Sequence, residues 1–263
     1  MSARWRFVLV AATVAAASVA LAEALIGGAA RSHHSRRRAA AGARVAGRRR
    51  TASLPRHVLL GRSVDGRPIR AVELGDRRLP TALLVVGCIH GNEPAGRGIA
   101  RLLEADPPAR AHVWVIEDLN PDGVAAGTRQ NAQGVDLNRN FPWGWRPLPR
   151  AGGQYSGPRP LYAPEARIAE RLILRARPRA TVWFHQPLDV VDQSGGDPAV
   201  ERRFARLAGM RERRLTRYPG SAAGWQNHQL PGTTAFVVEL PAGHLPQALT
   251  ERLAGALRTL ARG

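Results

Sequence analysis

The 263-residue chain contains one cysteine, no lysine and only 14 aromatic residues. The single cysteine, Cys88, excludes a disulfide within the chain, and no cysteine–histidine spacing of a structural zinc finger is present. The aromatic residues are not interleaved with basic stripes and no RNA- or DNA-binding motif is found, so we expect no nucleic-acid partner. Hydrophobic residues make up 44% of the chain and charged residues 22%, which are ordinary values for a folded protein and exclude a disordered or collagen-like one.

The sequence is also poor in acidic residues. It has 20 acidic residues and 39 arginines, which gives a net charge of +19. Such an excess is typical of proteins that bind polyanions. Ten of the arginines and a single acid, however, lie in residues 1–50, so about half of the excess falls in one fifth of the chain. We therefore interpret the charge as a property of the N-terminal segment and of arginine-biased coding, rather than as a binding surface.

The first 30 residues have the pattern of an export signal or of a membrane anchor. Two arginines precede an apolar run at residues 7–22 that ends in Ala-Leu-Ala, which is typical of a cleaved secretory signal. The apolar stretch also continues to residue 30, interrupted only by Glu23, and this length suffices for an uncleaved anchor that contacts the membrane through residues 7–30. Both alternatives predict an exported or membrane-anchored protein of the cell envelope, with its orientation left open. Residues 31–53 are small and basic and predict a flexible linker.

From residue 54 onward, short apolar runs alternate with amphipathic stretches. The apolar runs typical of strands buried in a parallel or mixed sheet are 81–88, 112–116, 180–184 and 234–240. The stretches that predict helices are 94–105, 164–175, 199–207 and 246–260. Asp65-Gly66, between strand-like runs at 57–60 and 69–74, indicates a hairpin turn. The alternation predicts one α/β domain over residues 54–263, a three-layer α/β/α structure with a mixed central sheet.

Polar side chains stand at the ends of three expected strands. His90 and Glu93 follow the run at 81–88, and His185 follows 180–184. Glu239 lies near the end of 234–240. Sites of open α/β sheets gather at the carboxyl ends of strands. Because imidazole nitrogens and carboxylate oxygens are zinc ligands, and catalytic zinc uses three protein ligands, we predict that His90, Glu93 and His185 bind a metal ion.

A second polar cluster lies at residues 120–142. It begins with Asn-Pro-Asp-Gly at 120–123, which has the pattern of a type I turn, and we interpret Asp122 as a turn residue. Further along, Asn138 and Arg139 stand among apolar neighbours. An arginine fork binds a carboxylate through two N–H groups, and an adjacent amide can complete the clamp. We therefore expect these two residues to bind a carboxylate group.

Four motifs together resemble the zinc carboxypeptidases. They are His-Gly-Asn-Glu at 90–93, Gly-Val-Asp-Leu-Asn-Arg-Asn-Phe-Pro at 134–142, Phe-His-Gln at 184–186 and Val-Val-Glu-Leu-Pro at 237–241. The resemblance covers about residues 55–262 and is greatest to the bacterial murein-peptide amidases. It implies a zinc-carboxypeptidase-like fold, one Zn²⁺ per chain, and hydrolysis of an amide bond next to a free carboxylate. In the murein-peptide amidases this bond joins γ-D-glutamate to diaminopimelate in cell-wall peptide.

The resemblance also implies roles for residues of the reaction centre. His90, Glu93 and His185 match the zinc ligands. Glu239 matches the catalytic carboxylate that takes a proton from water and passes it to the leaving amine. Arg129 matches the cation that polarises the carbonyl group of the bond to be cut.

Four further residues match positions that hold the substrate or support a ligand. Asn138 and Arg139 correspond to the clamp for the terminal carboxylate of the substrate. Asp136 corresponds to a carboxylate that orients the first histidine ligand, as physical principles expect behind a metal-bound imidazole. Tyr218 corresponds either to a mobile active-site tyrosine or to an ordinary surface tyrosine.

Two other functions are alternatives. Acylases of the aspartoacylase and succinylglutamate desuccinylase type share the opening His-Gly-[Asn/Asp]-Glu motif, although they lack the form of the string at 134–142. A non-catalytic protein that binds cell-wall polymer or another polyanion through its arginines is an alternative of a different class. It would not need His90, Glu93, His185 and Glu239, all of which are present.

Overall fold

The structure is a computed structural model that describes residues 53–263. The expected export signal or anchor at 1–30, and all but the last residue of the expected linker at 31–53, lie outside the described residues. Between residues 53 and 263, no helix has the length and apolar character needed to cross a membrane.

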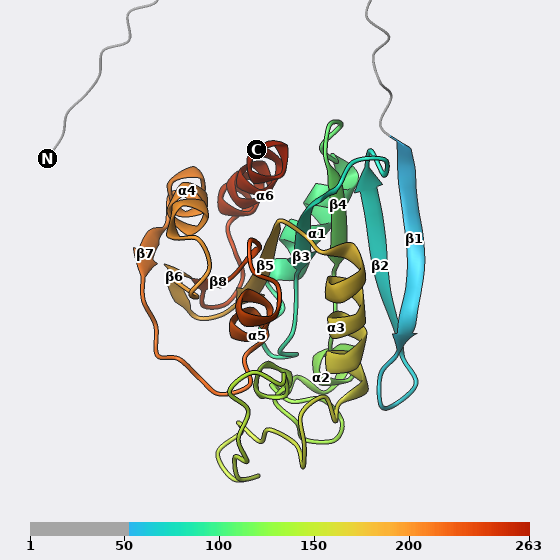
Figure 1. The fold of residues 1–263 in the computed structure, drawn as a ribbon, viewed down its shortest axis with the longest axis vertical. Helices are drawn as coiled ribbons and strands as arrows, with labels where there is room; N and C mark the ends of the chain where they lie inside the picture. The colour runs from blue at the N-terminus through green and yellow to red at the C-terminus, as the bar shows by residue number, and fades with distance from the viewer. Residues whose placement is uncertain (1–52) are drawn as a thin grey trace, which may run out of the picture. The chain divides into compact units, whose positions relative to one another are not determined.

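Eight strands form one mixed sheet in the order β1-β2-β4-β3-β5-β8-β6-β7 (Figure 1). The strands are β1 (Ser53–Arg62), β2 (Pro68–Gly75), β3 (Thr81–Val86), β4 (His112–Ile116), β5 (Ala180–His185), β6 (Leu188–Asp192), β7 (Arg211–Arg213) and β8 (Thr234–Pro241). The helices are α1 (Gly96–Ala105), α2 (Pro121–Ala126), α3 (Pro164–Ala176), α4 (Pro198–Ala208), α5 (Ala222–Gln229) and α6 (Gln247–Arg262), with a short 3-10 helix η1 (Leu137–Arg139).

The four apolar runs of the sequence form the centre of the sheet. β3 pairs in parallel with β4 and with β5, and β5 pairs in parallel with β8. Both faces of these strands are covered, which is why their sequences are apolar throughout rather than alternating. Antiparallel pairs β1–β2, β2–β4 and β6–β8 extend the sheet on the two sides. The predicted mixed sheet and the predicted hairpin are confirmed.

Helices cover both faces of the sheet. On one face, α1, α4 and α6 contribute apolar side chains such as Ile99, Phe204 and Leu257 to a buried core. On the other face, α3 and α5 contribute Leu172 and Trp225 to a second core. The helices α1, α3, α4 and α6 each turn an apolar stripe toward the strands and a polar face toward solvent. The expected three-layer α/β/α architecture is confirmed (Figure 1).

The Asn-Pro-Asp-Gly sequence begins helix α2, so its interpretation as a type I turn was wrong. The side chain of Asn120 accepts a hydrogen bond of 3.0 Å from the backbone N–H of Gly123 and caps the helix. Asp122 is buried and accepts hydrogen bonds of 2.7 Å from the Ser63 hydroxyl and from Nη1 of Arg67. A first helical turn and a type I turn favour the same residues, asparagine first and proline next. Asp122 therefore ties α2 to the β1–β2 hairpin.

The carboxyl ends of β3, β5 and β8 lie at the same edge of the sheet, because these three strands are parallel neighbours. Their register sets His185 directly beside Glu239. The irregular segment between α2 and α3, which contains η1, lies beyond this edge at the bottom of Figure 1. The motif residues of both polar clusters are thereby brought to one place.

Candidate active site

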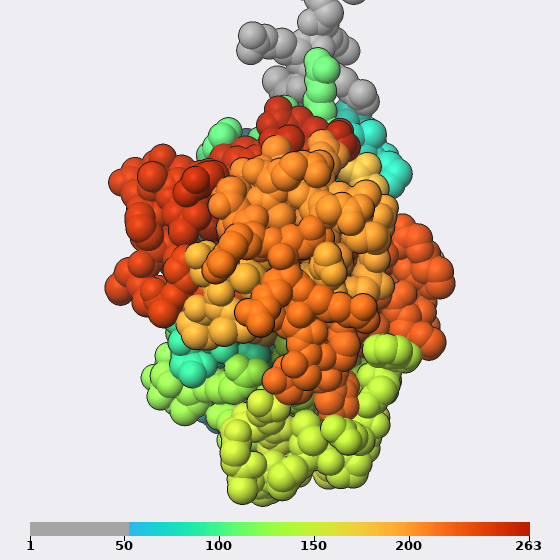
Figure 2. Space-filling view, turned by 90° about the vertical axis from the view of Figure 1, so that its left-hand side faces the viewer, coloured from blue at the N-terminus to red at the C-terminus, as the bar shows by residue number. Residues whose placement is uncertain are grey.

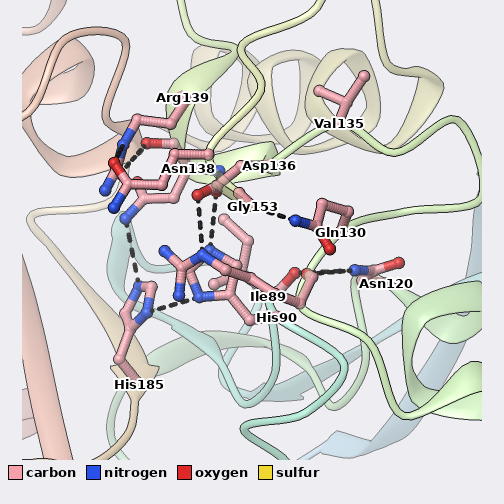
Figure 3. A network of polar contacts seen from close by, with 12 residues as sticks. Ile89, His90, Asn120, Gln130, Val135, Asp136, Asn138, Arg139, Gly153 and His185 are labelled. Carbon is pink, nitrogen blue, oxygen red and sulfur yellow. Dashed lines mark hydrogen bonds and ion pairs between the residues drawn. The ribbon is translucent and has the colours of Figure 1, made fainter. Parts of the chain in front are cut away.

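Three side chains with metal-binding atoms meet at the carboxyl ends of β3 and β5. Nδ1 of His90 lies 3.0 Å from Oε2 of Glu93, and Nδ1 of His185 lies 3.0 Å from the same oxygen. The two Nδ1 atoms are 3.1 Å apart, and Figure 3 shows the two rings turned toward one another. The three predicted ligands form a single buried group.

The spacing of these atoms fits a zinc ion. Zinc binds histidine nitrogen and carboxylate oxygen at about 2.0–2.2 Å in tetrahedral geometry, so neighbouring ligand atoms of one ion lie about 3.3–3.6 Å apart. The observed separations of 3.0 and 3.1 Å are a few tenths of an ångström shorter, so small side-chain shifts suffice to admit the ion. Glu93 and His185 also line a cavity, so a fourth position of the ion would be open to a substrate or to water. The residues present therefore fit the group that the sequence motifs imply.

A glycine makes the turn between the first two ligands possible. His90 and Glu93 are joined by a turn in which the N–H of Glu93 donates a hydrogen bond of 3.0 Å to the carbonyl oxygen of His90. At Gly91, a Cβ atom would lie 1.9 Å from the backbone carbonyl carbon of Gly123 in α2. No side chain fits there, so the turn packs against α2 only because residue 91 is glycine.

Asp136 lies behind the first histidine. Its Oδ1 atom is 2.9 Å from Nε2 of His90 and also accepts a hydrogen bond of 2.9 Å from the backbone N–H of Asn138 (Figure 3). The carboxylate is fully buried. An acceptor at Nε2 places the ring proton there and leaves Nδ1 free as a ligand atom. Asp136 thus stands where the sequence predicts a carboxylate that orients His90.

The charges of this group support one another in spite of their burial. Burial acts against the charged form of His90, but Asp136 and Glu93 outweigh it and raise the pKa of the imidazole. Burial lowers the pKa of His185, so this ring is neutral near pH 7. Burial alone would raise the pKa values of the two carboxyl groups, yet the adjacent histidines hold both well below their usual range. Glu93 and Asp136 are therefore ionised, as ligands and their supports must be.

Arg129 lies between the two carboxylates. Its Nη1 donates a hydrogen bond of 2.8 Å to Oε1 of Glu93, and its Nε donates one of 2.9 Å to Oδ2 of Asp136. The side chain also lines the cavity. Its guanidinium group has more N–H donors than these two bonds use. Arg129 therefore fixes the ligand group from behind and presents a cation to the cavity.

Glu239 faces the same cavity from β8. Its backbone pairs with that of His185, and its carboxyl group lines the cavity. Burial and the neighbouring Glu93 raise the pKa of Glu239 to about 7. Its Oε2 atom is buried and has no hydrogen-bond partner among the described residues. A buried carboxyl oxygen without a partner is costly, and in a cavity beside possible metal ligands a catalytic role is one explanation for such a group.

The predicted carboxylate clamp lies across the cavity, in η1. Asn138 directs its Nδ2 atom to Nε2 of His185 at 3.5 Å, while its Oδ1 accepts a hydrogen bond from the N–H of Ala222. Burial lowers the pKa of Arg139, although an arginine stays charged in proteins. The ring of Tyr218 lies over the Arg139 guanidinium, 4.1 Å from centroid to Cζ, and is 45% exposed. Tyr218 is thus a surface residue that contacts the clamp, so both interpretations of it stay open.

One cavity of about 410 Å³ joins these residues. Those of the predicted site that line it are Glu93, Arg129, Asn138, Arg139, His185, Tyr218 and Glu239. His90 and Asp136 lie behind them and are fully buried. The structure therefore brings together all nine residues that the sequence singled out.

Comparison with known proteins agrees with this geometry. The family model described as zinc carboxypeptidase matches residues 47–191, which is more than half of the chain. The chain belongs to the zinc carboxypeptidase family. Glu239 and Tyr218 lie outside the matched range, so their assignment rests on the structure and on the motif around Glu239.

Relatives of this zinc carboxypeptidase include bacterial amidases and eukaryotic carboxypeptidases. Murein peptide amidase A of Vibrio campbellii is 32% identical over 200 residues, which cover 69% of this chain and 77% of that protein. The match to murein peptide amidase A of Escherichia coli K12 is 32% identical and covers 50% of this chain and 60% of that protein. Carboxypeptidase SOL1 of Arabidopsis thaliana is 34% identical over 36% of this chain, a segment that spans only 23% of the relative.

Solved structures of the family have the same fold. Murein-tripeptide amidase from Escherichia coli O157 superposes with a TM-score of 0.65 and 26% identity, covering 82% of this chain and 95% of that one. Carboxypeptidase A from Helicoverpa armigera superposes with a TM-score of 0.66 at 17% identity, over 80% of this chain and 68% of that one, and shows the fold alone.

Three further residues of this zinc carboxypeptidase line the cavity, although the sequence did not predict them as site residues. The backbone N–H of Gln186 donates a hydrogen bond of 3.2 Å to Oε2 of Glu93, and its side chain bonds the carbonyl oxygens of Pro241 and Gly243. Asp192 and Arg217 line the far wall. Gln186 follows a ligand within a recognised motif and could have been found from the sequence. Asp192 and Arg217 lie in no motif and reach the cavity only through the path of the chain.

Proposed function

We propose that this zinc carboxypeptidase binds one Zn²⁺ through His90, Glu93 and His185 and hydrolyses the amide bond next to a free carboxylate in a cell-wall peptide. One observation carries the proposal: the ligand group, an unpaired buried carboxyl oxygen on Glu239 and a buried arginine at Arg139 all border one cavity. Hydrolysis of a terminal amide bond needs these three elements together. A polymer-binding protein needs none of them.

The terminal carboxylate of the substrate is held by Asn138 and Arg139. A charge-assisted hydrogen bond from a buried guanidinium is roughly twice as strong as a neutral one. Because the clamp lies in the same cavity as the metal group, it places only the last amide bond of a peptide at the reaction centre. Removal of one terminal residue, rather than internal cleavage, follows from this arrangement.

Proton transfer is the task of Glu239. When bound, the zinc ion supplies a Lewis acid that polarises the substrate carbonyl and acidifies water. Glu239, with a pKa raised to about 7, takes a proton from the attacking water and gives it to the leaving amine. A pKa close to the operating pH suits a group that acts first as a base and then as an acid. The Arg129 guanidinium, held by Glu93 and Asp136, directs a free N–H toward the charge that develops on the carbonyl oxygen.

A cell-wall peptide is proposed as the substrate because the bacterial relatives are murein peptide amidases. The Vibrio campbellii protein matches over most of its length, and the Escherichia coli structure is matched over 95% of its chain. The N-terminal 30 residues, with the pattern of an export signal or an anchor, support a location in the cell envelope where such peptides occur.

Substitution of Glu239 by glutamine tests the proposal. We expect Glu239→Gln to bind one zinc ion per chain and to unfold like the wild type, while hydrolysis of L-Ala-γ-D-Glu-diaminopimelate falls by about 10²–10⁴-fold. The control is Glu73→Gln, which changes a buried glutamate on β2 outside the cavity. Metal content is measured by atomic emission and product release by chromatography. Normal turnover of Glu239→Gln would overturn the assignment, and hydrolysis of N-acyl amino acids in place of peptides would favour the acylase alternative.

A further inference from the structure

Strand β1 forms one edge of the sheet and leaves that edge uncovered. It is ten residues long and, among the described strands, pairs only with β2. The other edge strand, β7, has three residues, and Figure 2 shows the orange segment after it running over that side of the molecule. A long edge strand offers free backbone N–H and C=O groups, and proteins usually protect such an edge. β1 instead carries two exposed leucines, Leu54 at 86% and Leu59 at 55%.

Two neighbouring hollows form a groove between β1 and α3. The first, of about 540 Å³, is mainly apolar and includes Leu59 of β1 and Leu174 of α3. The second, of about 500 Å³, includes Arg77, which follows β2. Val58 and Arg175 line both hollows, so the hollows adjoin. This β1–α3 groove therefore has an apolar part next to a part with arginines.

Three arginines of the β1–α3 groove have no carboxylate partner among the described residues. Arg171 and Arg175 are exposed and lie one turn apart on α3. The Arg175 guanidinium lies over the ring of Trp114, with its Cζ atom 5.6 Å from the ring centroid. Arg77 donates a hydrogen bond of 3.1 Å to the carbonyl oxygen of Leu54. Like charges one turn apart repel one another on a helix, so a bound anion stabilises both.

Charge decides which partner fits the groove. Glu73 is the one acid among the described residues that line it, and its buried carboxylate is already bound by Arg56 and His112. A second copy of the chain would set the same arginines against each other. The segment at 31–52 has eight arginines and no acid, so the groove repels it too. An anionic partner is therefore favoured. The net charge of the chain does not identify this partner, but unpaired arginines beside exposed leucines do.

We propose that the β1–α3 groove docks the catalytic domain on the surface of an anionic phospholipid bilayer. Lipid phosphates bind Arg77, Arg171 and Arg175. Leu54 and Leu59 enter the layer between the headgroups and the acyl chains, which a water-soluble polyanion lacks. No residue of β1 or α3 lines the cavity of the active site, so the docked domain keeps its cavity open. This inference does not depend on the proposed reaction.

The sequence before β1 supports a lipid partner. Residues 1–30 have the pattern of an export signal or a membrane anchor, and 22 residues, 31–52, join them to β1. A segment of this length extends at most about 75 Å. An anchor at residues 7–30 would thus keep β1 within reach of a bilayer.

Hydrogen exchange of the full chain on vesicles tests the proposal. The chain is added to phosphatidylcholine vesicles with or without about 30% phosphatidylglycerol. We expect amide exchange in β1 and α3 to slow on the anionic vesicles only. The comparison of the two compositions cancels contacts that residues 7–30 make with either bilayer. An arginine near an anionic bilayer contributes about fivefold to binding, so Arg171→Gln/Arg175→Gln lowers the docking constant by about 30-fold.

Arg202→Gln/Arg206→Gln is the matched control. These two arginines have the same spacing on α4, are exposed and line neither hollow. The control removes the same charge, and we expect it to keep the protection of β1 and α3. Leu54→Ser/Leu59→Ser is expected to lower the docking constant by about tenfold or more, because the leucines no longer enter the bilayer.

Three results would overturn the inference. The first is equal exchange on both kinds of vesicle, or equal protection in both arginine variants. The second is exchange in β1 that slows with protein concentration in the absence of vesicles, which identifies a second copy as the partner. The third is protection by soluble polyphosphate together with an unchanged docking constant of Leu54→Ser/Leu59→Ser, which assigns the groove to an anionic polymer. Hydrolysis of soluble peptides is expected to be unchanged in all three variants, so each of these results leaves the proposed function standing.

Discussion

Replacing Asp136 by asparagine removes one charge behind the metal group and leaves the size of the side chain unchanged. In the wild type, Oδ1 of Asp136 accepts hydrogen bonds from His90 and from the N–H of Asn138, and Oδ2 accepts one from Arg129. Asparagine keeps an acceptor at Oδ1 but places an NH₂ group against the N–H of Arg129. His90 then loses the anion that fixes its tautomer, and one N–H donor of the partly buried Arg129 loses its partner.

The expected result of Asp136→Asn is a loss of zinc affinity by 10- to 100-fold, the usual effect of changing a carboxylate behind a histidine ligand. This corresponds to about 1.4–2.7 kcal/mol. The dissociation constant is measured by competition with a chromophoric chelator at pH 7.5. Unfolding in urea is followed on the same samples, because the lost hydrogen bond of the partly buried Arg129 also lowers the free energy of unfolding by about 0.5–1.5 kcal/mol.

Asp122→Asn is the matched control. Asp122 is 3% exposed, and like Asp136 it accepts three hydrogen bonds, one of them from an arginine, but it touches no member of the metal group. Both variants are expected to lose stability, and only Asp136→Asn to lose zinc affinity. Zinc affinity of Asp136→Asn within twofold of the wild type, or an equal loss in Asp122→Asn, would refute the reasoning.

Two further predictions concern the fold around the site. Gly91→Ala is expected to lower the free energy of unfolding by several kcal/mol and to weaken zinc binding, because its Cβ would meet the α2 backbone. Gly98→Ala in α1, where the nearest neighbour of a Cβ is 3.7 Å away, is expected to raise the free energy of unfolding by about 0.5–1 kcal/mol. Urea titration of both variants distinguishes a tight turn from a general intolerance of alanine. Burial raises the pKa of Glu201 from 4.5 to about 7, so the folded protein keeps a proton that the unfolded chain releases, and stability is lost as the pH rises through this range. Glu201→Gln has no such proton to lose. We therefore expect the free energy of unfolding of Glu201→Gln, taken relative to that of the wild type, to rise by up to about 3 kcal/mol between pH 4.5 and 8. A difference between the two proteins that does not change with pH would count against the buried acid.

The sequence predicted the central strands and the helices that cover them because these elements are long and strongly patterned. It missed β6, β7, α2 and α5. β7 has three residues, and β6 is a five-residue strand with Asp189 in a left-handed conformation, so neither has a recognisable period. α5 contains Gly224, and its apolar residues are not gathered into one stripe, so its sequence lacks a helical period.

The candidate site was predicted more completely than the fold around it. His90, Glu93 and His185 stand at the ends of strands that pattern alone identifies, and the motif at 134–142 supplies the clamp. Asp192 and Arg217 could not be predicted, because their meeting depends on the pairing of β6 with β8 and on the course of the segment after β7. Asp192 and Arg217 thus reach the cavity through long-range contacts, whereas the residues of the metal group follow strands that the local sequence predicts.

The position of β8 has a consequence for the order of events during synthesis of the protein. β8 is the last strand of the chain, yet it lies between β5 and β6 in the sheet. The strands that precede the three metal-binding residues come earlier in the chain and are neighbours in the sheet, whereas Glu239 arrives with β8 itself. The strand that completes the sheet therefore also brings the carboxyl group to which the proposed reaction assigns proton transfer. All three metal-binding residues are thus synthesised before Glu239, and the cavity has its full set of lining residues only after β8 has entered the sheet.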